Sequence, residues 1–131
     1  MTSDRTRKAI NESIWVSRPP DEVFDFVRSV GNLSRWSWFR NIRPMEANLY
    51  QAEDIEGICR FFWIVDSGRM RVILQQTQNK DSPSLVVSIT EVNGGSQVRS
   101  QYSSFRISTT QRHHLTQQMS AIKKLVEVHS A

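Results

Sequence analysis

The fold depends most on one stretch of the sequence, Ile14-Trp-Val-Ser-Arg-Pro-Pro-Asp-Glu-Val-Phe-Asp-Phe-Val-Arg-Ser-Val-Gly-Asn-Leu-Ser-Arg-Trp36. Apolar and polar residues alternate through residues 10–17, which predicts a strand with one face turned inward. The two prolines end that strand, because proline cannot donate a hydrogen bond to a ladder. Pro20 suits the first turn of a helix, and Gly31 is expected to end it. Asn32 fits the cap of a second, short helix.

Further strands are predicted by alternation in the middle of the chain. They are expected over residues 40–46, 49–55, 59–66, 69–78, 85–92 and 97–107. Asp66-Ser67-Gly68 and Asn93-Gly94-Gly95 are sequences typical of tight turns. Strands joined by tight turns pair antiparallel, so a parallel sheet with crossover helices is not expected.

The end of the chain predicts one long helix, from about Thr109 to Val128. Ser108 to Gln111 fits a capping box, in which the hydroxyl and the glutamine side chain each bond a free backbone N–H. Leu115, Met119, Ile122 and Val126 then recur at helical spacing. About 20 helical residues span about 30 Å, enough to cross a small sheet.

This order of elements resembles the START/SRPBCC superfamily, the helix-grip fold of polyketide cyclases, lipid-transfer domains and pollen-allergen-like proteins. The resemblance is sharpest in the Pro-Pro-x-x-Val-Phe segment that begins at Pro19 and in Asn32-Leu-Ser-Arg-Trp36. It implies an α+β fold: a curved antiparallel sheet of about six or seven strands on a long C-terminal helix, with two short helices after the first strand. We expect a single domain over residues 10–131 and a flexible tail over residues 1–9.

Composition narrows the class of protein. The 131 residues fit one domain, the single cysteine excludes an intramolecular disulfide, and the net charge of +4 does not require a nucleic-acid partner. No apolar run approaches the roughly 20 residues that span a bilayer, and no signal-peptide core follows the first residues. We therefore expect a soluble cytoplasmic protein without integral membrane contact. The sequence has no phosphate loop, nucleophile elbow or zinc-ligand spacing, so no cofactor and no metal are expected.

The resemblance also implies an elongated apolar cavity between the sheet and the terminal helix, suited to a small apolar or aromatic molecule. The residues expected to line it face inward by strand or helix periodicity: Phe61, Trp63, Met70, Val72, Leu74, Leu85, Val87, Ile89, Leu115, Met119 and Ile122. The alternative is that these side chains fill the core by packing against each other. Ser100, Tyr102 and Ser104 would add hydroxyl groups to the cavity, and Trp36 and Trp38 would border its mouth.

Three kinds of function remain open. The first is a carrier or binding protein for a hydrophobic ligand. The second is an enzyme similar to polyketide cyclases or dehydratases, with Tyr102 as the proton donor and Arg106 or His113 polarising a carbonyl. The third is a protein-interaction module, or a homodimer, that uses the outward face of the sheet through Phe62, Ile64 and Ile73. Cys59 is interpreted as a small buried hydrophobe, and the acidic residues Glu53, Asp54 and Glu56 as a solvated strand end.

Overall fold

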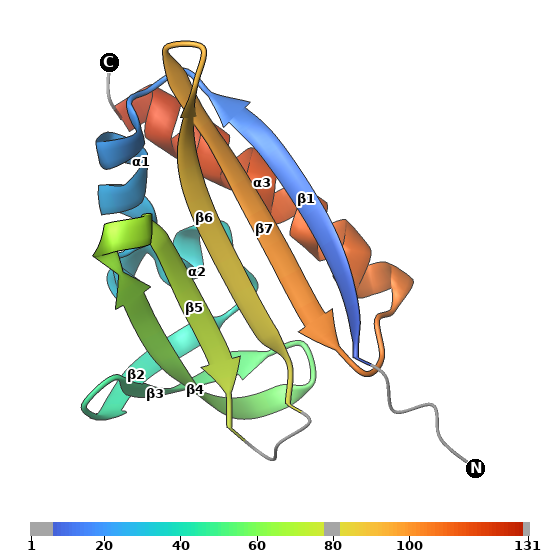
Figure 1. Ribbon diagram of the computed structural model, residues 1–131. Coiled ribbons are helices and arrows are strands. Elements are labelled where there is room, and N and C mark those ends of the chain that lie inside the picture. Colours follow the sequence, from blue (N-terminus) through green and yellow to red (C-terminus); the bar gives the residue numbers. More distant parts are fainter. Residues whose placement is uncertain (1–6, 78–81, 130–131) are drawn as a thin grey trace.

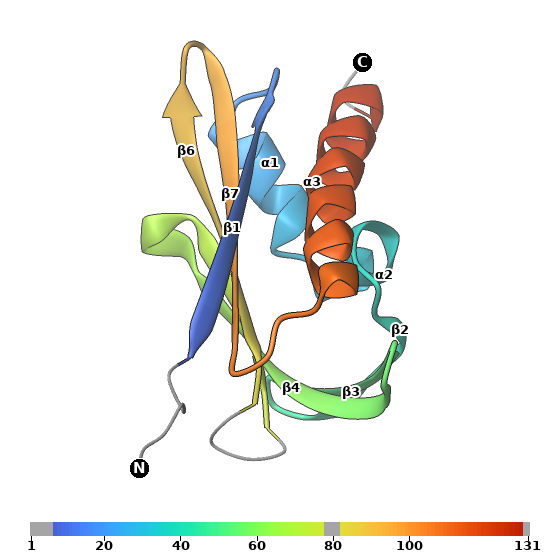
Figure 2. The ribbon, with the colours of Figure 1, turned by 90° about the vertical axis from the view of Figure 1, so that its right-hand side faces the viewer.

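The computed structural model describes residues 7–77 and 82–129, and it shows one seven-stranded antiparallel sheet with a long helix across its concave side (Figures 1 and 2). The strands are β1 (Lys8–Val16), β2 (Arg40–Glu46), β3 (Leu49–Asp54), β4 (Gly57–Asp66), β5 (Arg71–Gln76), β6 (Ser84–Val92) and β7 (Gly95–Ser104). The helices are α1 (Pro20–Val27), α2 (Leu33–Trp36) and α3 (Thr109–His129), with short 3₁₀ turns η1 (Val30–Asn32) and η2 (Ser67–Arg69). The predicted fold class is confirmed.

The strand order across the sheet is β1-β7-β6-β5-β4-β3-β2, so the first strand lies beside the last. Helices α1 and α2 follow β1 and lie against α3 (Figure 2). No helix in residues 7–77 and 82–129 is both long enough and apolar enough to cross a membrane.

Several boundaries differ from the sequence prediction. Strand β1 begins at Lys8, and residues 1–6 of the expected tail lie outside the described part of the chain. Helix α1 ends at Val27. The Arg28 N–H closes its last turn on the Phe24 carbonyl at 2.8 Å, and the next residue, Ser29, is already extended with a ψ of 116°. Gly31 therefore lies in η1, and the prediction that it ends the helix was wrong.

Asn32 occupies the N-cap position of α2 as predicted, but its side chain does not cap the helix. Its side-chain amide donates to the Phe26 carbonyl at 3.0 Å and makes no capping bond to α2. Strand β5 begins at Arg71 because the preceding residues form η2, and Met70 adopts a left-handed backbone with a φ of 47°. The predicted strand end at residue 78 lies outside the described residues.

Two turn and cap predictions are confirmed. Asn93 and Gly94 have φ angles of 52° and 80°, and consecutive left-handed residues are what a tight hairpin between β6 and β7 requires. At the start of α3, the Ser108 N–H donates to Oε1 of Gln111 at 2.7 Å, and the Gln111 N–H donates to Oγ of Ser108 at 3.1 Å. These two reciprocal bonds form the capping box.

Strand β2 is an irregular edge of the sheet. Its register against β3 shifts between Arg40 and Arg43 and again between Pro44 and Glu46. Asn41 has a left-handed φ of 53°. The strand curves away with β3 beneath the start of α3 (Figure 2).

A polar latch joins the end of β1 to the end of α3. The Glu127 carboxylate accepts bonds from the Ser17 N–H at 2.8 Å, the Ser17 hydroxyl at 3.0 Å and the Lys123 ammonium at 2.8 Å. The Lys123 bond, followed by the Ser17 N–H bond, lowers the pKa of Glu127 from its ordinary 4.5 to about 2. Folding therefore favours the ionised form of the Glu127 carboxyl group.

The latch predicts a pH-dependent contribution to stability. A carboxyl group with a depressed folded-state pKa stabilises the fold fully above its unfolded pKa, and loses that contribution as the pH falls through the folded value. We expect Glu127→Gln to lower the free energy of unfolding at pH 7 by about 1 kcal/mol. The difference from wild type should shrink between about pH 4.5 and pH 2. Urea unfolding across that range measures it.

Glu91→Gln is the matched control, because Glu91 is exposed and its side chain has no hydrogen bond among the described residues. A constant difference between Glu127→Gln and wild type down to pH 2 would contradict the latch.

Candidate functional site

A hollow of about 220 Å³ lies where the β3–β4 hairpin passes beneath the start of α3. Five of its ten lining residues come from that hairpin, and the others come from the chain after α2, the end of β5, the approach to β6, β7 and the first turn of α3. The lining residues are Trp38, Asp54, Ile55, Glu56, Ile58, Cys59, Gln76, Pro83, Tyr102 and Gln111. Trp38 and Tyr102 are the two predicted ligand-binding residues that meet here.

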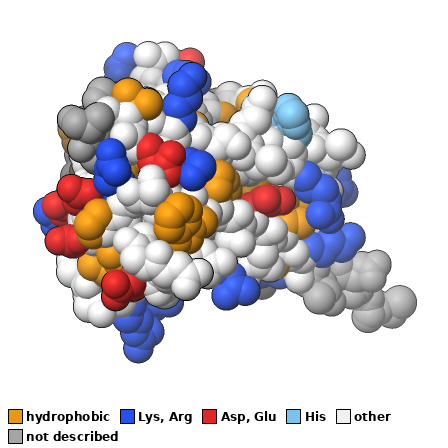
Figure 3. Space-filling model, turned by 90° about the horizontal axis from the view of Figure 1, so that it is seen from above, with side chains coloured by type: hydrophobic (Ala, Val, Ile, Leu, Met, Phe, Trp, Pro, Cys, Tyr) orange, Lys and Arg blue, Asp and Glu red, His pale blue; other side chains and the backbone are white. Residues whose placement is uncertain are grey.

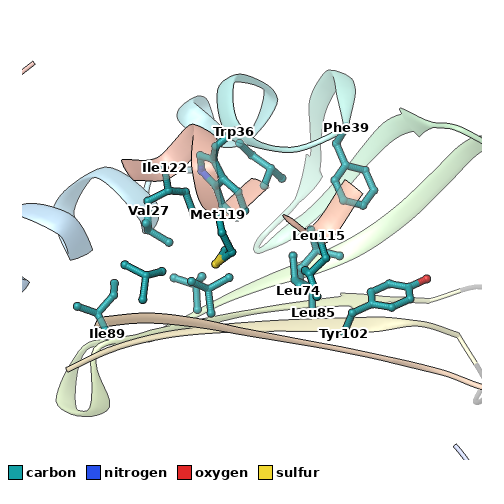
Figure 4. Packing of buried hydrophobic residues seen from close by; sticks show 14 of the residues in the cluster. Val27, Trp36, Phe39, Leu74, Leu85, Ile89, Tyr102, Leu115, Met119 and Ile122 are labelled. Atoms are coloured by element: carbon teal, nitrogen blue, oxygen red, sulfur yellow. The ribbon is translucent and has the colours of Figure 1, made fainter. Parts of the chain in front are cut away.

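Tyr102 carries its hydroxyl into this hollow. The ring is buried at the edge of the apolar cluster, and the hydroxyl points away from the core (Figure 4). The Gln111 side-chain amide donates to the Tyr102 oxygen at 3.2 Å. The capping box fixes the Gln111 backbone, so the start of α3 positions this polar contact.

The phenol of Tyr102 remains protonated at neutral pH. Burial raises its pKa, a hydrogen bond with Ser104 lowers it, the charges of Glu56 and Asp54 raise it, and Arg7 lowers it. The net direction is upward. Tyr102 can therefore donate a hydrogen bond to a ligand in the hollow.

Cys59 lies on the concave face of β4 and is 3% exposed. Burial, and then the charge of Asp54 and a hydrogen bond to it, raise the pKa of the thiol to about 12. A thiol that remains protonated is a poor nucleophile. Its place in the wall of the hollow therefore fits the sequence interpretation of a small hydrophobe.

Gln76 was missed by the sequence analysis. It follows Val72 and Leu74 on the buried face of β5, is 8% exposed and lines the hollow. Its backbone is bonded, but its side-chain amide has no partner among the described residues. A glutamine at an inward position of a strand was the signal that could have identified it.

Trp38 stands between this hollow and a second one of about 210 Å³ on its other side. The second hollow lies between α2 and α3 and is lined by Arg35, Trp36, Ser37, Trp38, Arg40, His114, Gln117, Gln118 and Ala121. The Trp38 ring meets Tyr102 edge-on at 6.2 Å and His114 edge-on at 5.4 Å between centroids. Trp36 is 2% exposed, anchors α2 in the core and borders the second hollow alone, whereas Trp38 borders both hollows.

Most of the other predicted cavity residues form a closely packed core (Figure 4). A side chain beside a water-sized space keeps accessible surface, but Phe61, Val87, Leu115 and Ile122 have 0%. The others of this group are 1–3% exposed: Val72, Leu74, Leu85, Ile89 and Met119. For these residues the structure shows core packing, the alternative that the sequence left open.

The remaining predicted residues have structural contacts. The Trp63 indole donates to the Arg28 carbonyl at 2.9 Å. The Ser100 hydroxyl is fully buried and donates to the Met119 sulfur at 3.4 Å. Ser104 is buried next to Tyr102, and Met70 packs against the core from its left-handed turn.

Arg106 and His113 do not join Tyr102. Both side chains are exposed, and neither lines the hollow. His113 lies instead in a surface depression between α3 and β1, with Ile10, Glu12 and Arg112 among its walls. Adjacent helical residues differ in direction by about 100°. His114 is the histidine that turns toward Trp38.

Comparison with known proteins identifies the fold. No family model matches the sequence, and no curated protein matches it. The structure is similar to the Zhui aromatase/cyclase from Streptomyces sp. R1128, with a TM-score of 0.80 and 11% identity over 96% of this chain and 97% of that chain. It is also similar to norcoclaurine synthase from Thalictrum flavum, with a TM-score of 0.71 and 13% identity over 96% and 98% of the two chains.

A third similar structure is the di-domain ARO/CYC StfQ from the steffimycin biosynthetic pathway, with a TM-score of 0.76 and 15% identity. The alignment covers 92% of this chain and 45% of StfQ, so the chain spans less than half of that protein. At these identities the comparisons show the shared fold.

Proposed function

We propose that this chain, which has the helix-grip fold of the START/SRPBCC superfamily, binds or carries a small apolar or aromatic molecule in the hollow beside Trp38 and Tyr102. The observation that carries the proposal is the composition of the walls. An indole, a buried phenol and apolar side chains line one part of the hollow, and two carboxylates and two glutamine side chains line the rest. Small-molecule sites combine apolar and aromatic surface, which supplies contact area, with placed polar groups that fix the orientation of the ligand.

The size of the hollow limits the ligand. Its volume of about 220 Å³ lies below the usual range for pockets that hold drug-sized molecules, about 300–1,000 Å³. The core side chains beyond it leave no water-sized space beside Phe61 or Leu115. A ligand of one or two rings fits this hollow better than a long acyl or poly-keto chain.

Tyr102→Phe separates a carrier from an enzyme. A neutral hydrogen bond contributes about 0.5–1.5 kcal/mol, so binding should weaken by roughly two- to tenfold if the hydroxyl only orients the ligand. Turnover of a keto substrate should fall by about 10²–10⁴ if Tyr102 is a general acid. Titrations and single-turnover assays with a panel of one- and two-ring aromatic compounds measure both quantities.

Ser103→Ala is the control for this variant, because Ser103 precedes Ser104 on β7 and does not line the hollow. Trp38→Phe should remove the ligand-dependent change in tryptophan fluorescence. If wild type shows no such change and no binding with any compound of the panel, the proposed site is rejected.

The convex face of the sheet is a separate surface, for which we propose self-association of two copies. Phe62 and Ile64 are 42% and 43% exposed, and Ile64 pairs with Ile73 on the neighbouring strand. Neighbouring apolar side chains on an exposed sheet face can meet the same face of a second copy across a two-fold axis. On the end of the molecule seen in Figure 3, hydrophobic side chains lie singly or in small groups among charged ones.

Light scattering on wild type and on Ile64→Glu tests this surface. We expect wild type to dimerise at high micromolar concentration and the variant to remain a monomer, because a buried unpaired carboxylate opposes association. Glu12→Gln on β1 is the control, because Glu12 is not part of the apolar group formed by Phe62, Ile64 and Ile73. A wild type that is monomeric throughout the range would contradict self-association.

A further inference from the structure

The hollow has an acidic wall. Asp54 and Glu56 lie in the β3–β4 hairpin, and no lysine or arginine is among its described lining residues. One Asp54 oxygen accepts the Glu56 N–H at 2.8 Å, and neither carboxylate forms an ion pair with a described residue. Asp54 is half-buried and Glu56 exposed, as expected of a solvated strand end. The hairpin that carries them curls beneath α3 (Figure 2), and both residues line the same hollow as Trp38 and Tyr102.

Gln76 gives a second and independent sign of a ligand. The residue is more than nine-tenths buried, and its side-chain amide faces the hollow from the concave side of β5 with no partner among the described residues. The amide atoms themselves keep some accessible surface, so a molecule in the hollow can reach them. A ligand with N–H groups would satisfy the amide oxygen.

The two carboxylates act on the interior of the hollow. Their charges both raise the pKa of Tyr102, and the charge of Asp54 also raises the pKa of Cys59. Arg7 acts on Tyr102 in the opposite direction, but it does not line the hollow, so the charges at its wall are negative. Carboxylates attract a cation, and the Trp38 and Tyr102 rings offer π surfaces that cations also favour.

We propose that the ligand is a small aromatic amine, bound with its ammonium group between Asp54 and Glu56 and its ring against Trp38 and Tyr102. The ammonium group donates to the two carboxylates and to the Gln76 amide oxygen. This inference rests on the proposed function, because it names the class of ligand for the same hollow.

Isothermal titration with three compounds of similar size tests the proposal. They are 2-phenylethylamine, 2-phenylethanol and 3-phenylpropionate, which share a phenyl ring and end in a cation, a neutral hydroxyl and an anion. We expect the amine to bind about tenfold or more tightly than the alcohol, since hydrogen bonds to charged groups exceed neutral ones by about that factor. The propionate should bind most weakly.

Asp54→Asn and Glu56→Gln remove one charge each and keep similar shapes. The side-chain amide oxygen that Asp54→Asn introduces can still accept the Glu56 N–H, so the hairpin keeps this bond. Each variant should bind the amine several-fold more weakly and the alcohol as wild type does. Glu53→Gln is the matched control, because it removes the same charge from the same strand at an exposed position outside the hollow.

The outcomes distinguish a failure of the amine inference from a failure of the proposed binding site. Equal binding of amine and alcohol, or unchanged amine binding in both Asp54→Asn and Glu56→Gln, overturns the amine inference and leaves the binding site. Equal weakening by Glu53→Gln overturns it as well, because the effect would then be a general change in charge. Failure of all three compounds to bind rejects both the inference and the site.

Discussion

A chain that ends at Ser108 is expected to lose its cooperative fold. Helix α3 contributes Leu115, Met119, Ile122 and Val126 to the core, each 0–3% exposed. Full burial of one such side chain contributes about 1.5–3 kcal/mol, so the four together contribute about 6–12 kcal/mol. That is comparable to the whole free energy of unfolding of an ordinary domain, about 5–15 kcal/mol.

Circular dichroism and urea titration of the truncated chain measure this loss. A chain ending at Val128 is the control, since it keeps all four core residues and removes only the last three residues of the sequence. A cooperative transition and a native far-UV spectrum in the chain that ends at Ser108 would show that the sheet folds without α3.

The second large effect is expected from neighbouring phenylalanines on opposite faces of β4. Phe61 is 0% exposed and packs against Phe39 and Tyr50, with ring centroids at 5.5 and 5.8 Å, whereas Phe62 is 42% exposed. Phe61→Ala should lower the free energy of unfolding by about 3–5 kcal/mol, because a large cavity replaces a buried ring.

Phe62→Ala provides the comparison, with an expected cost below about 1 kcal/mol for a surface position. Urea unfolding of both variants tests the register of the strand, since a shift of one residue would exchange the two side chains between faces. Equal costs, or a larger cost for Phe62→Ala, would contradict the register in which Phe61 faces Gln76.

The difference between Phe61 and Phe62 also shows how much the sequence could predict. Alternation alone placed Phe61 inward and Phe62 outward, and the Ser108–Gln111 cap placed the start of α3, because both depend on residues close together in the chain. The sequence order was likewise enough to indicate the helix-grip fold.

The site could be predicted only in part. Tyr102 and Trp38 were among the expected residues, and the inward position of Gln76 on β5 was a signal that went unused. Asp54 was not expected, because its approach to the aromatic side chains depends on how far the β3–β4 hairpin curls. Whether Phe61 and Leu115 leave a cavity between them depends on how side chains interlock in three dimensions. Periodicity gives only the face on which a residue lies.

The irregular edge strand β2 bears on how copies of this protein can meet at high concentration. A regular edge strand exposes a row of unpaired N–H and C=O groups that can recruit another chain into a growing intermolecular sheet. Pro44 has no N–H to offer, Asn41 turns the backbone out of the strand conformation, and two register shifts interrupt the row. This edge therefore resists aggregation by strand addition.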